Sequence, residues 1–347
     1  MNQGPLESGK ISVALLAELL AGLPPSPPEL RLGPGVGEDA CAIAIGGELV
    51  VAASDPVTLT ADQAGFVSVL VSANDVAVTG ARPRWFLSVV LVPPGTNGSE
   101  VRDVFADIGR ALERVGAHLV GGHTEVTDAV NRPVVVGQML GLAEGGRVVA
   151  TGGARIGDVV VQVGPAPVEG AAVLAYDAGV QLQGLEPTLL EAAGTAADRP
   201  GISVVESALL AARLGATAMH DPTEGGLAAG LHELAHASDV RISVDREAVL
   251  WFEPGVAVCQ ALDADPWATL ASGALLAAFP ETDVRSALLA LSTEGHQAAV
   301  IGRAEVGSGV YDSRGRAIAW PERDEVARLA SAGFTRRGVA PRHGREM

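Results

Sequence analysis

Short apolar runs typical of buried strands alternate with longer runs of helical spacing, and this alternation occurs in both halves of the chain. In the first half, the pattern predicts strands at 40–45, 49–54, 85–92, 117–121 and 133–142. It predicts helices there at 11–20, at 62–79 and between Asn97 and Gly116. In the second half it predicts strands at 159–163, 241–245, within 268–279 and at 297–302. The helices expected there cover 169–177, 187–196, 203–214, 226–237, 255–263 and 282–292. Because each half mixes strands with helices, we expect an α/β (α+β) protein of two domains.

The 347 residues are enough for two domains of ordinary size. We place the boundary near 150–156, which gives an N-terminal domain at 1–153 and a C-terminal domain at 154–311. From 312 to 347 the chain becomes rich in arginine and loses its apolar rhythm. This last part is expected to be a peripheral tail with one helix at 322–332.

The chain carries a formal net charge of −17, and this restricts its partners. So acidic a surface repels phosphate backbones, which argues against nucleic acid. A protein of this charge that binds a nucleotide needs local neutralisation, and a divalent cation is the simplest source. We find no signal-peptide pattern and no apolar run near the ~20 residues that span a bilayer. We therefore expect a cytoplasmic protein without a membrane segment.

Three aspartates stand at the ends of predicted elements and form a candidate metal site. Asp39 opens the strand 40–45, and Asp55 closes the strand 49–54. The midpoint between the two falls on the turn of this hairpin, so antiparallel pairing would place them opposite one another. Asp75 lies on the following helix, beside Asn74. Magnesium prefers oxygen ligands of this kind, although each aspartate taken alone is explained as well by capping a turn or helix.

A second motif, Gly121-Gly122-His123-Thr124-Glu125, is expected in the loop at the exit of a strand. Glycines there would allow a phosphate to approach the backbone, and Thr124 can donate to a phosphate oxygen. Glu125 is a candidate metal ligand, and His123 a candidate phosphate contact or acid–base group. The alternative is an ordinary turn with a hydrogen-bonded histidine.

A third motif, HDPTEGG at 220–226, precedes a helix with clear apolar spacing. Free N–H groups at a helix N-terminus bind anions, so the loop is a candidate phosphate site. An ordinary cap by Asp221 or Thr223 explains part of the motif, but not His220 and the two glycines. Lys10 is a candidate phosphate contact, or an exposed lysine near the chain end. Neither a Walker A motif nor a dinucleotide-binding GxGxxG in its proper context is present.

Taken in order, six segments resemble the AIR (aminoimidazole ribonucleotide) synthase-related superfamily, with a PurM-like fold. They are GPGVGEDA (33–40), SD (54–55), ANDVAVTGARPRWF (73–86), VGGHTEVT (120–127), MHDPTEGGL (219–227) and SGALL (272–276). The likeness covers roughly residues 9–305, and HypE-like members are the most similar. It implies ATP and Mg²⁺ in a cleft between the two domains, and an N-terminal domain that pairs with its twin in a homodimer.

Carried over by position, the resemblance assigns roles to particular residues of this sequence. Metal ligands would be Asp39, Asp55, Asp75 and Glu125. Catalytic groups would be Asp55, Asp75, His123, His220 and Asp221. The nucleotide would contact Lys10, Glu38, Asp39, Asn74, Gly121, Gly122, Thr124, Thr223, Glu224, Gly225 and Gly226.

The sequence also departs from its relatives. HypE proteins end in a cysteine that carries the reacting group, whereas this chain has no cysteine after Cys259, so that carbamoyl dehydration is not expected. Lys10 has no cysteine beside it, unlike selenophosphate synthetase, and His123 replaces the aspartate typical of thiamine-monophosphate kinases. The segment 164–170 carries prolines where relatives are richer in glycine.

Three functions follow as hypotheses. The chain is an Mg-ATP-dependent enzyme that activates an oxygen of its substrate by phosphorylation, a kinase of the thiamine-monophosphate type, or a non-catalytic nucleotide-binding assembly factor. The acceptor is a small molecule or a protein whose identity the sequence does not reveal. A protein partner in a maturation pathway is a further expectation.

Overall fold

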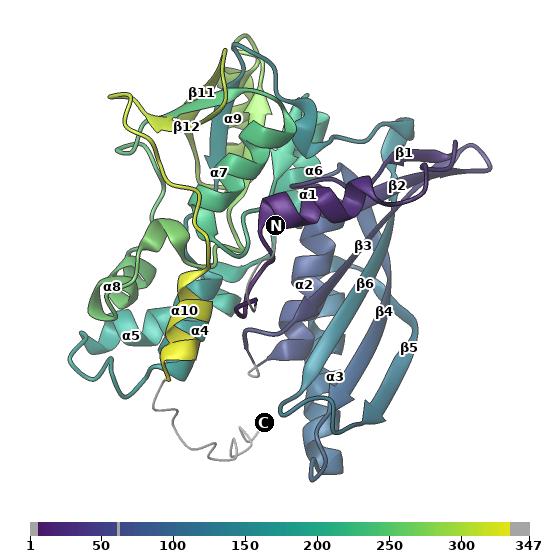
Figure 1. The fold of residues 1–347 in the computed structure, drawn as a ribbon, viewed down its shortest axis with the longest axis vertical. Helices are drawn as coiled ribbons and strands as arrows, with labels where there is room; N and C mark the ends of the chain where they lie inside the picture. The colour runs from purple at the N-terminus through teal and green to yellow at the C-terminus, as the bar shows by residue number, and fades with distance from the viewer. Residues whose placement is uncertain (1–5, 61–62, 334–347) are drawn as a thin grey trace.

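The computed structural model describes residues 6–60 and 63–333, and these form two sheets with their helices (Figure 1). The first sheet has the strand order β1-β2-β3-β6-β4-β5. Its strands are β1 (Leu30–Leu32), β2 (Ala40–Ile45), β3 (Glu48–Val57), β4 (Ala81–Val92), β5 (His118–Val126) and β6 (Val134–Ala143). Only the pair β4–β5 is parallel among these neighbours.

Helix α2 (Ala64–Ala77) covers one face of this sheet and is buried along its whole length. Helix α3 (Gly98–Val115) packs on its outer side, and α6 (Val205–Arg213) of the second domain contacts it as well. A helix enclosed on all sides is apolar all round, which fits its run of Ala, Val, Leu and Phe. Helix α1 (Val13–Ala21) lies near the boundary between the domains.

The opposite face of the first sheet has no helix over it in Figure 1, yet it is apolar. Along β4 and β6 buried residues alternate with half-exposed ones, as expected for a sheet with one covered face. The half-exposed apolar side chains include Trp85, Leu87, Val89, Leu91, Val134, Val136, Leu140 and Leu142. We call this surface the open face.

The second sheet has the order β12-β9-β11-β7-β10-β8. Its strands are β7 (Val159–Val163), β8 (Ala218–His220), β9 (Arg241–Val244), β10 (Leu275–Phe279), β11 (Ala298–Glu305) and β12 (Gly309–Asp312). The helices besides α6 are α4 (Glu169–Asp177), α5 (Pro187–Gly194), α7 (Gly226–Ala237), α8 (Glu253–Ala261), α9 (Val284–Thr293) and α10 (Glu325–Ala332). Short helical turns are η1 (Glu144–Gly146), η2 (Thr151–Gly153), η3 (Ala197–Gly201) and η4 (Pro266–Ala268).

The central strands β7 and β10 are buried on both faces. Leu276 and Ala278 of β10 belong to a core that includes Leu227 and Leu231 of α7. The alternate residues Leu275 and Phe279 belong to the other core, which continues into the first domain. The continuous core explains how the two domains hold a fixed arrangement.

The structure confirms the mixed α/β architecture and corrects several predicted elements. The strands β1, β8 and β12 were not predicted, and β4 begins four residues earlier than expected. β3 continues to Val57, so Asp55 lies inside the strand and does not close it. The register pairs Ala40 with Ala53. Extended by one residue, this register places Asp39 opposite Ser54, whereas the sequence predicted that Asp39 lies opposite Asp55.

The segment after residue 311, which we expected to be peripheral, packs against the second domain as far as the described chain extends. Ile318, Asp324 and Val326 are buried, and Trp320 stacks on His232 of α7 with ring centroids 4.9 Å apart. Residues 334–347 of the predicted tail lie outside the described residues. No helix in the described parts of the chain is long and apolar enough to cross a bilayer.

Candidate functional site

Three carboxylates from separate elements converge at the boundary between the domains. Asp39 immediately precedes β2, Asp75 lies on α2, and Asp221 immediately follows β8. Each offers an oxygen, and these oxygens lie within 4.8 Å of one another. Asp75 and Asp221 are buried, whereas the Asp39 side chain is 38% exposed. The cluster thus has an accessible side from which an ion or a phosphate can approach.

Asp221 has the most unusual environment of the three. It is fully buried, and neither of its carboxylate oxygens accepts a hydrogen bond. Burial raises the pKa of Asp221 to about 8, although the neighbouring His220 opposes the rise. Burial also raises the pKa of Asp75 well above its usual range, and Asp221 adds to that effect. Two buried carboxylates whose charges His220 and Lys10 offset only in part are costly, which is the situation that a bound cation relieves.

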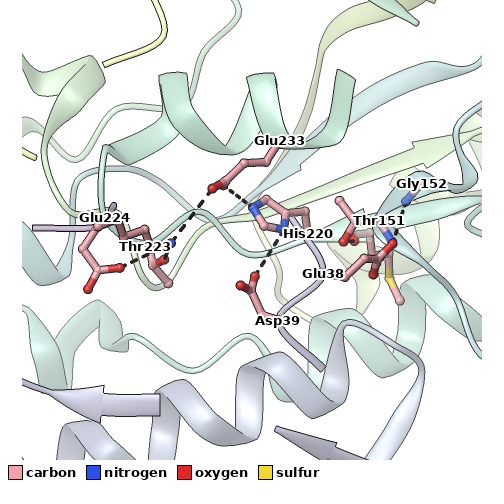
Figure 2. Close-up of polar contacts among 10 residues, drawn as sticks. Glu38, Asp39, Thr151, Gly152, His220, Thr223, Glu224 and Glu233 are labelled. Atoms are coloured by element: carbon pink, nitrogen blue, oxygen red, sulfur yellow. Dashed lines mark hydrogen bonds and ion pairs between the residues drawn. The ribbon is translucent and has the colours of Figure 1, made fainter. Parts of the chain in front are cut away.

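His220 holds a buried ion pair beside this cluster (Figure 2). Its Nε2 lies 2.8 Å from Oε2 of Glu233 on α7, and its Nδ1 lies 3.7 Å from Asp39. Burial alone would lower the pKa of His220, but Glu233 more than compensates and raises it to about 9. Burial opposes the ionisation of Glu233 in turn, and the hydrogen bond from His220 brings its pKa down to about 2. His220 is therefore a cation at neutral pH and fixes one edge of the acidic cluster.

Lys10 joins the same region from the N-terminal segment. Its Nζ donates to Oγ1 of Thr223 over 3.1 Å and lies 3.5 Å from Glu224. Asp55 is nearby: burial raises its pKa to about 7, Glu224 adds to the rise, and Lys10 opposes it. Asp55 is not one of the three clustered carboxylates, so its predicted role as a metal ligand stays a prediction.

The chain neighbours of two clustered aspartates tie the N-terminal domain to the rest of the protein. Oε1 and Oε2 of Glu38 accept hydrogen bonds from the backbone N–H groups of Gly152 and Thr151, in the turn η2 (Figure 2). Asn74 is fully buried; it donates to the carbonyl of Ile202 and accepts from the N–H of Val204, both over 2.8 Å. We expected both side chains to contact the nucleotide. In the structure their polar groups hold the domains together.

The loop before α7 differs from the predicted anion site. The N–H of Gly225 donates to Oδ2 of Asp324 over 2.8 Å, and that of Gly226 donates to the carbonyl of Thr223 over 3.0 Å. These two amides are occupied within the chain and are not free for a phosphate. Gly226 has a φ of +67°, and a Cβ there would lie 2.5 Å from the carbonyl oxygen of Trp267. Close packing therefore explains this glycine.

The segment Gly121–Glu125 lies inside β5 and not in a strand-end loop. β5 is the exposed edge of the first sheet and pairs only with β4 (Figure 1). A Cβ on Gly122 would lie 2.1 Å from the carbonyl oxygen of Ser88, so strand pairing explains that glycine. His123 Nε2 lies 3.0 Å from Glu125 Oε2, and both are exposed. Glu125 is not part of the carboxylate cluster, and the proposed roles of Gly121, His123, Thr124 and Glu125 stay predictions.

A cavity of about 830 Å³ opens beside the cluster. It is lined by α1, by the loop 34–39, by the start of α7 and by residues 320–324. Its charged lining residues include Lys10, Asp39, Glu224 and Arg323. The volume is within the range of small-molecule and cofactor sites.

Sequence reasoning missed three acids of this region: Asp324 and Glu169, which are buried, and Glu233, whose side chain is 13% exposed. Glu233 gave a usable signal, because it interrupts the apolar stretch of a helix next to the HDPTEGG motif. Asp324 gave no such signal in the sequence, since Gly225, whose N–H donates to it, is 99 residues away along the chain. Asp221 was predicted as a catalytic group but not as a member of the carboxylate cluster.

Comparison with known proteins agrees with this architecture. Residues 37–143 match the family model "AIR synthase related protein, N-terminal domain", and residues 155–312 match "AIR synthase related protein, C-terminal domain". The carbamoyl dehydratase HypE of Rhodobacter capsulatus is 30% identical over 253 residues, which cover 72% of each chain. The thiamine-monophosphate kinase of Pyrococcus abyssi (strain GE5 / Orsay) is 28% identical over 295 residues, covering 82% of this chain and 87% of the kinase.

A solved structure of the hydrogenase maturation protein HypE in complex with ATP has a similar fold. It superposes with a TM-score of 0.69 at 24% identity and covers 83% of this chain and 90% of the HypE chain. The two matching family models together span most of the sequence and meet at the boundary between the two sheets. The chain therefore belongs to the AIR synthase-related family.

Proposed function

We propose that this protein binds Mg-ATP in the cavity between its domains and uses it to activate an oxygen of its substrate by phosphorylation. The observation that carries the proposal is the buried carboxylate of Asp221, which accepts no hydrogen bond and lies within reach of Asp39 and Asp75. An ATP-bound relative with the same fold supports the choice of nucleotide.

The donor set fits magnesium, which prefers carboxylate oxygens and shares its remaining positions with water and phosphates. Asp39, Asp75 and Asp221 would hold the ion, with Asp55 as a further candidate. The ion would neutralise phosphate charge during transfer. Lys10 brings a positive charge to the wall of the cavity, and its bonds to Thr223 and Glu224 orient that charge.

His220 has a supporting role in this proposal. It is a buried cation held by Glu233, so it neutralises part of the acidic cluster and keeps Asp39 in place. Its Nδ1 has no hydrogen-bond partner and is 3.7 Å from Asp39. The proposed catalytic contribution of His220 is electrostatic, because a group with a pKa of about 9 is a poor base at neutral pH.

The chain is 28% identical to a thiamine-monophosphate kinase, so transfer of phosphate to a phosphate group of the substrate is a second candidate function. Product analysis separates the two: a kinase yields a stable phosphorylated product, whereas activation yields free phosphate and a condensed or dehydrated product. Tight ATP binding without turnover would indicate the third hypothesis, a nucleotide-binding assembly factor.

We further propose a homodimer formed through the open face. Its apolar side chains on β4 and β6 lie beside the edge strand β5, where Leu119, Val120 and Val126 are also exposed. Contiguous apolar patches of this kind mark interaction surfaces, and a twin surface is the simplest self-complementary partner. A cytoplasmic location and a protein partner in a maturation pathway stay predictions from the sequence.

Calorimetric titration with Mg-ATP tests the main proposal. Asp75→Asn and Asp221→Asn are expected to weaken binding about 100-fold, because each removes a charged ligand oxygen. Glu247→Gln is a matched control, since that carboxylate is exposed and distant from the cluster. Binding of Mg-ATP to the two aspartate variants with the affinity of the unsubstituted protein would refute the assigned site.

A further inference from the structure

A second, smaller cavity lies beside the proposed nucleotide site, and two of its lining residues, Glu169 and Ser272, have no role in the function proposed above. Its volume is about 20 Å³, enough for a group of the size of one water molecule. Its polar lining consists of Asp55, Thr58, Thr60, Glu169, Thr223, Glu224 and Ser272, and the other lining residues are apolar. Glu224 also lines the 830 Å³ cavity, so the two spaces share a wall.

Glu169 and Ser272 have unused acceptors in this cavity. Both are buried, and neither Oε2 of Glu169 nor Oγ of Ser272 has a partner at full hydrogen-bond geometry, although Ser272 lies close enough to Glu169 to oppose the rise of its pKa. Glu169 stands in the first turn of α4, where carboxylates commonly cap the helix. Capping does not explain this one, because it is turned into a buried cavity and α4 has no side-chain cap.

The prolines of 164–168 and the tight packing of Gly170 fix Glu169 in this position. The residues from Ala166 to Gly170 are buried, and a Cβ on Gly170 would lie 2.5 Å from the Thr269 side chain. The segment that is richer in glycine in relatives is thus a rigid wall here. A buried polar group held rigidly without a partner indicates that a ligand supplies the partner.

The lining also defines the chemistry of that ligand. Three carboxylates and four hydroxyl-bearing residues line one small space, while the Lys10 ammonium is committed to Thr223 and Glu224. Such a site favours a small group that is positively charged and rich in hydrogen-bond donors. Burial raises the pKa of Glu169 to about 8, as expected for a carboxylate whose counter-charge comes with a ligand.

We infer that the cavity of Glu169 and Ser272 binds an amino group of a second substrate, which is either free ammonium or the primary amine end of a larger molecule. The inference rests on the proposed function, because it names the chemical class of the second substrate. The amine would lie across Glu224 from the nucleotide cavity, and Glu169 and Ser272 would orient it.

The test uses the full-length protein without nucleotide, at about pH 8 and constant ionic strength. Thermal unfolding is followed in ammonium, methylammonium, potassium and tetramethylammonium chloride. Ammonium at saturating concentration should raise the midpoint by roughly 2–4 °C relative to tetramethylammonium, which has no N–H donor. An equal rise with methylammonium indicates the amine end of a larger acceptor, and a rise with ammonium alone indicates free ammonium.

Glu169→Gln and Ser272→Ala should each reduce the rise at least by half, and Glu247→Gln should leave it unchanged. The inference is overturned if potassium acts as strongly as ammonium, or if Glu169→Gln responds like the unsubstituted protein. Circular dichroism shows whether the variants are folded, and calorimetry shows whether they still bind Mg-ATP. An ammonium response without ATP binding would refute only the proposed function, and ATP binding without an ammonium response would refute only this inference.

Discussion

The two sheets of this protein are covered differently. The first has α2 and α3 on one side and the apolar open face on the other, whereas the central strands of the second are buried on both sides. The covered side of the first sheet carries Asp75 on α2, and the end of β8 in the second carries Asp221. The covered side of the first sheet thus contributes to the candidate site, and its open face is the surface that we propose for association.

A charge placed in each sheet gives the largest effect and tests this contrast directly. Val161→Asp, in fully buried β7, should cost at least about 4 kcal/mol of unfolding free energy, because the charge has no partner or water there. Val136→Glu, on the half-exposed open face of β6, should cost less than about 1 kcal/mol but yield a monomer. Denaturant unfolding and sedimentation equilibrium measure the two outcomes. A loss of stability of equal size in both variants would contradict the contrast.

The ion pair of His220 and Glu233 belongs entirely to the second domain. Glu233→Gln should lower the unfolding free energy by about 3 kcal/mol, since it leaves a buried histidine without its counter-charge. The pKa of His220, followed by NMR, should fall from about 9 toward or below its ordinary value. Glu113→Gln, at an exposed position of α3, is the control. An unchanged histidine pKa would show that Glu233 does not hold the charge.

The attachment between the domains should also be measurable. Asn74→Ala removes two buried hydrogen bonds to the second domain and leaves the carbonyl of Ile202 and the N–H of Val204 unpaired. The expected loss is about 2–3 kcal/mol, with separate melting of the two domains in calorimetry. Asn131→Ala, in an exposed turn, should keep the single transition. A single sharp transition in Asn74→Ala would show that the shared core alone couples the domains.

The smallest expected effect is a pH dependence that originates where the domains meet. The pKa of Asp221 is raised to about 8, so the folded state binds more protons than the unfolded state between about pH 4 and pH 8. Stability of the metal-free protein should therefore fall by about 2 kcal/mol from pH 6 to pH 8. His220, with a pKa raised to about 9, contributes in the same direction above pH 6.5.

Denaturant titrations at pH 6, 7 and 8 measure this slope, and Asp221→Asn should make it shallower, leaving the part that His220 and Glu169 contribute. The same variant should be more stable than the unsubstituted protein at pH 8 when Mg²⁺ is absent, because it removes an unpaired buried charge. A stability that rises with pH over this interval would show that Asp221 already has a counter-charge in the folded protein.

Much of the fold follows from local pattern. The helices α4 and α7 begin and end where their apolar spacing and glycines predict, because those signals are local. The three-residue strands β1 and β8 escape prediction, since they are too short to show an alternation and exist only through pairing. Gly121–Glu125 was misplaced for a similar reason: pairing with β4 extends the strand through glycines that suggest a loop.

The candidate site was predictable in its parts but not in its arrangement. The motifs around Asp39, Asp75 and Asp221 stand out in the sequence, yet a one-residue offset of the hairpin register separates Asp39 from Asp55. Asp221 joins the carboxylate cluster only because of the way the two sheets pack together, and no local sequence pattern predicts that packing. The roles of Glu38 and Asn74 depend on the same docking.

Glu38 precedes Asp39 and accepts hydrogen bonds from the turn η2, which packs against α7 and β8 of the second domain. Asn74 precedes Asp75 and bonds directly to backbone of the second domain. The two halves cannot swing apart without dragging both carboxylates away from Asp221. Widening the cleft would then also separate the ligands of the cation that we propose. A ligand bound through that cation would connect the two domains, and its dissociation rate would be limited by how often the domains separate.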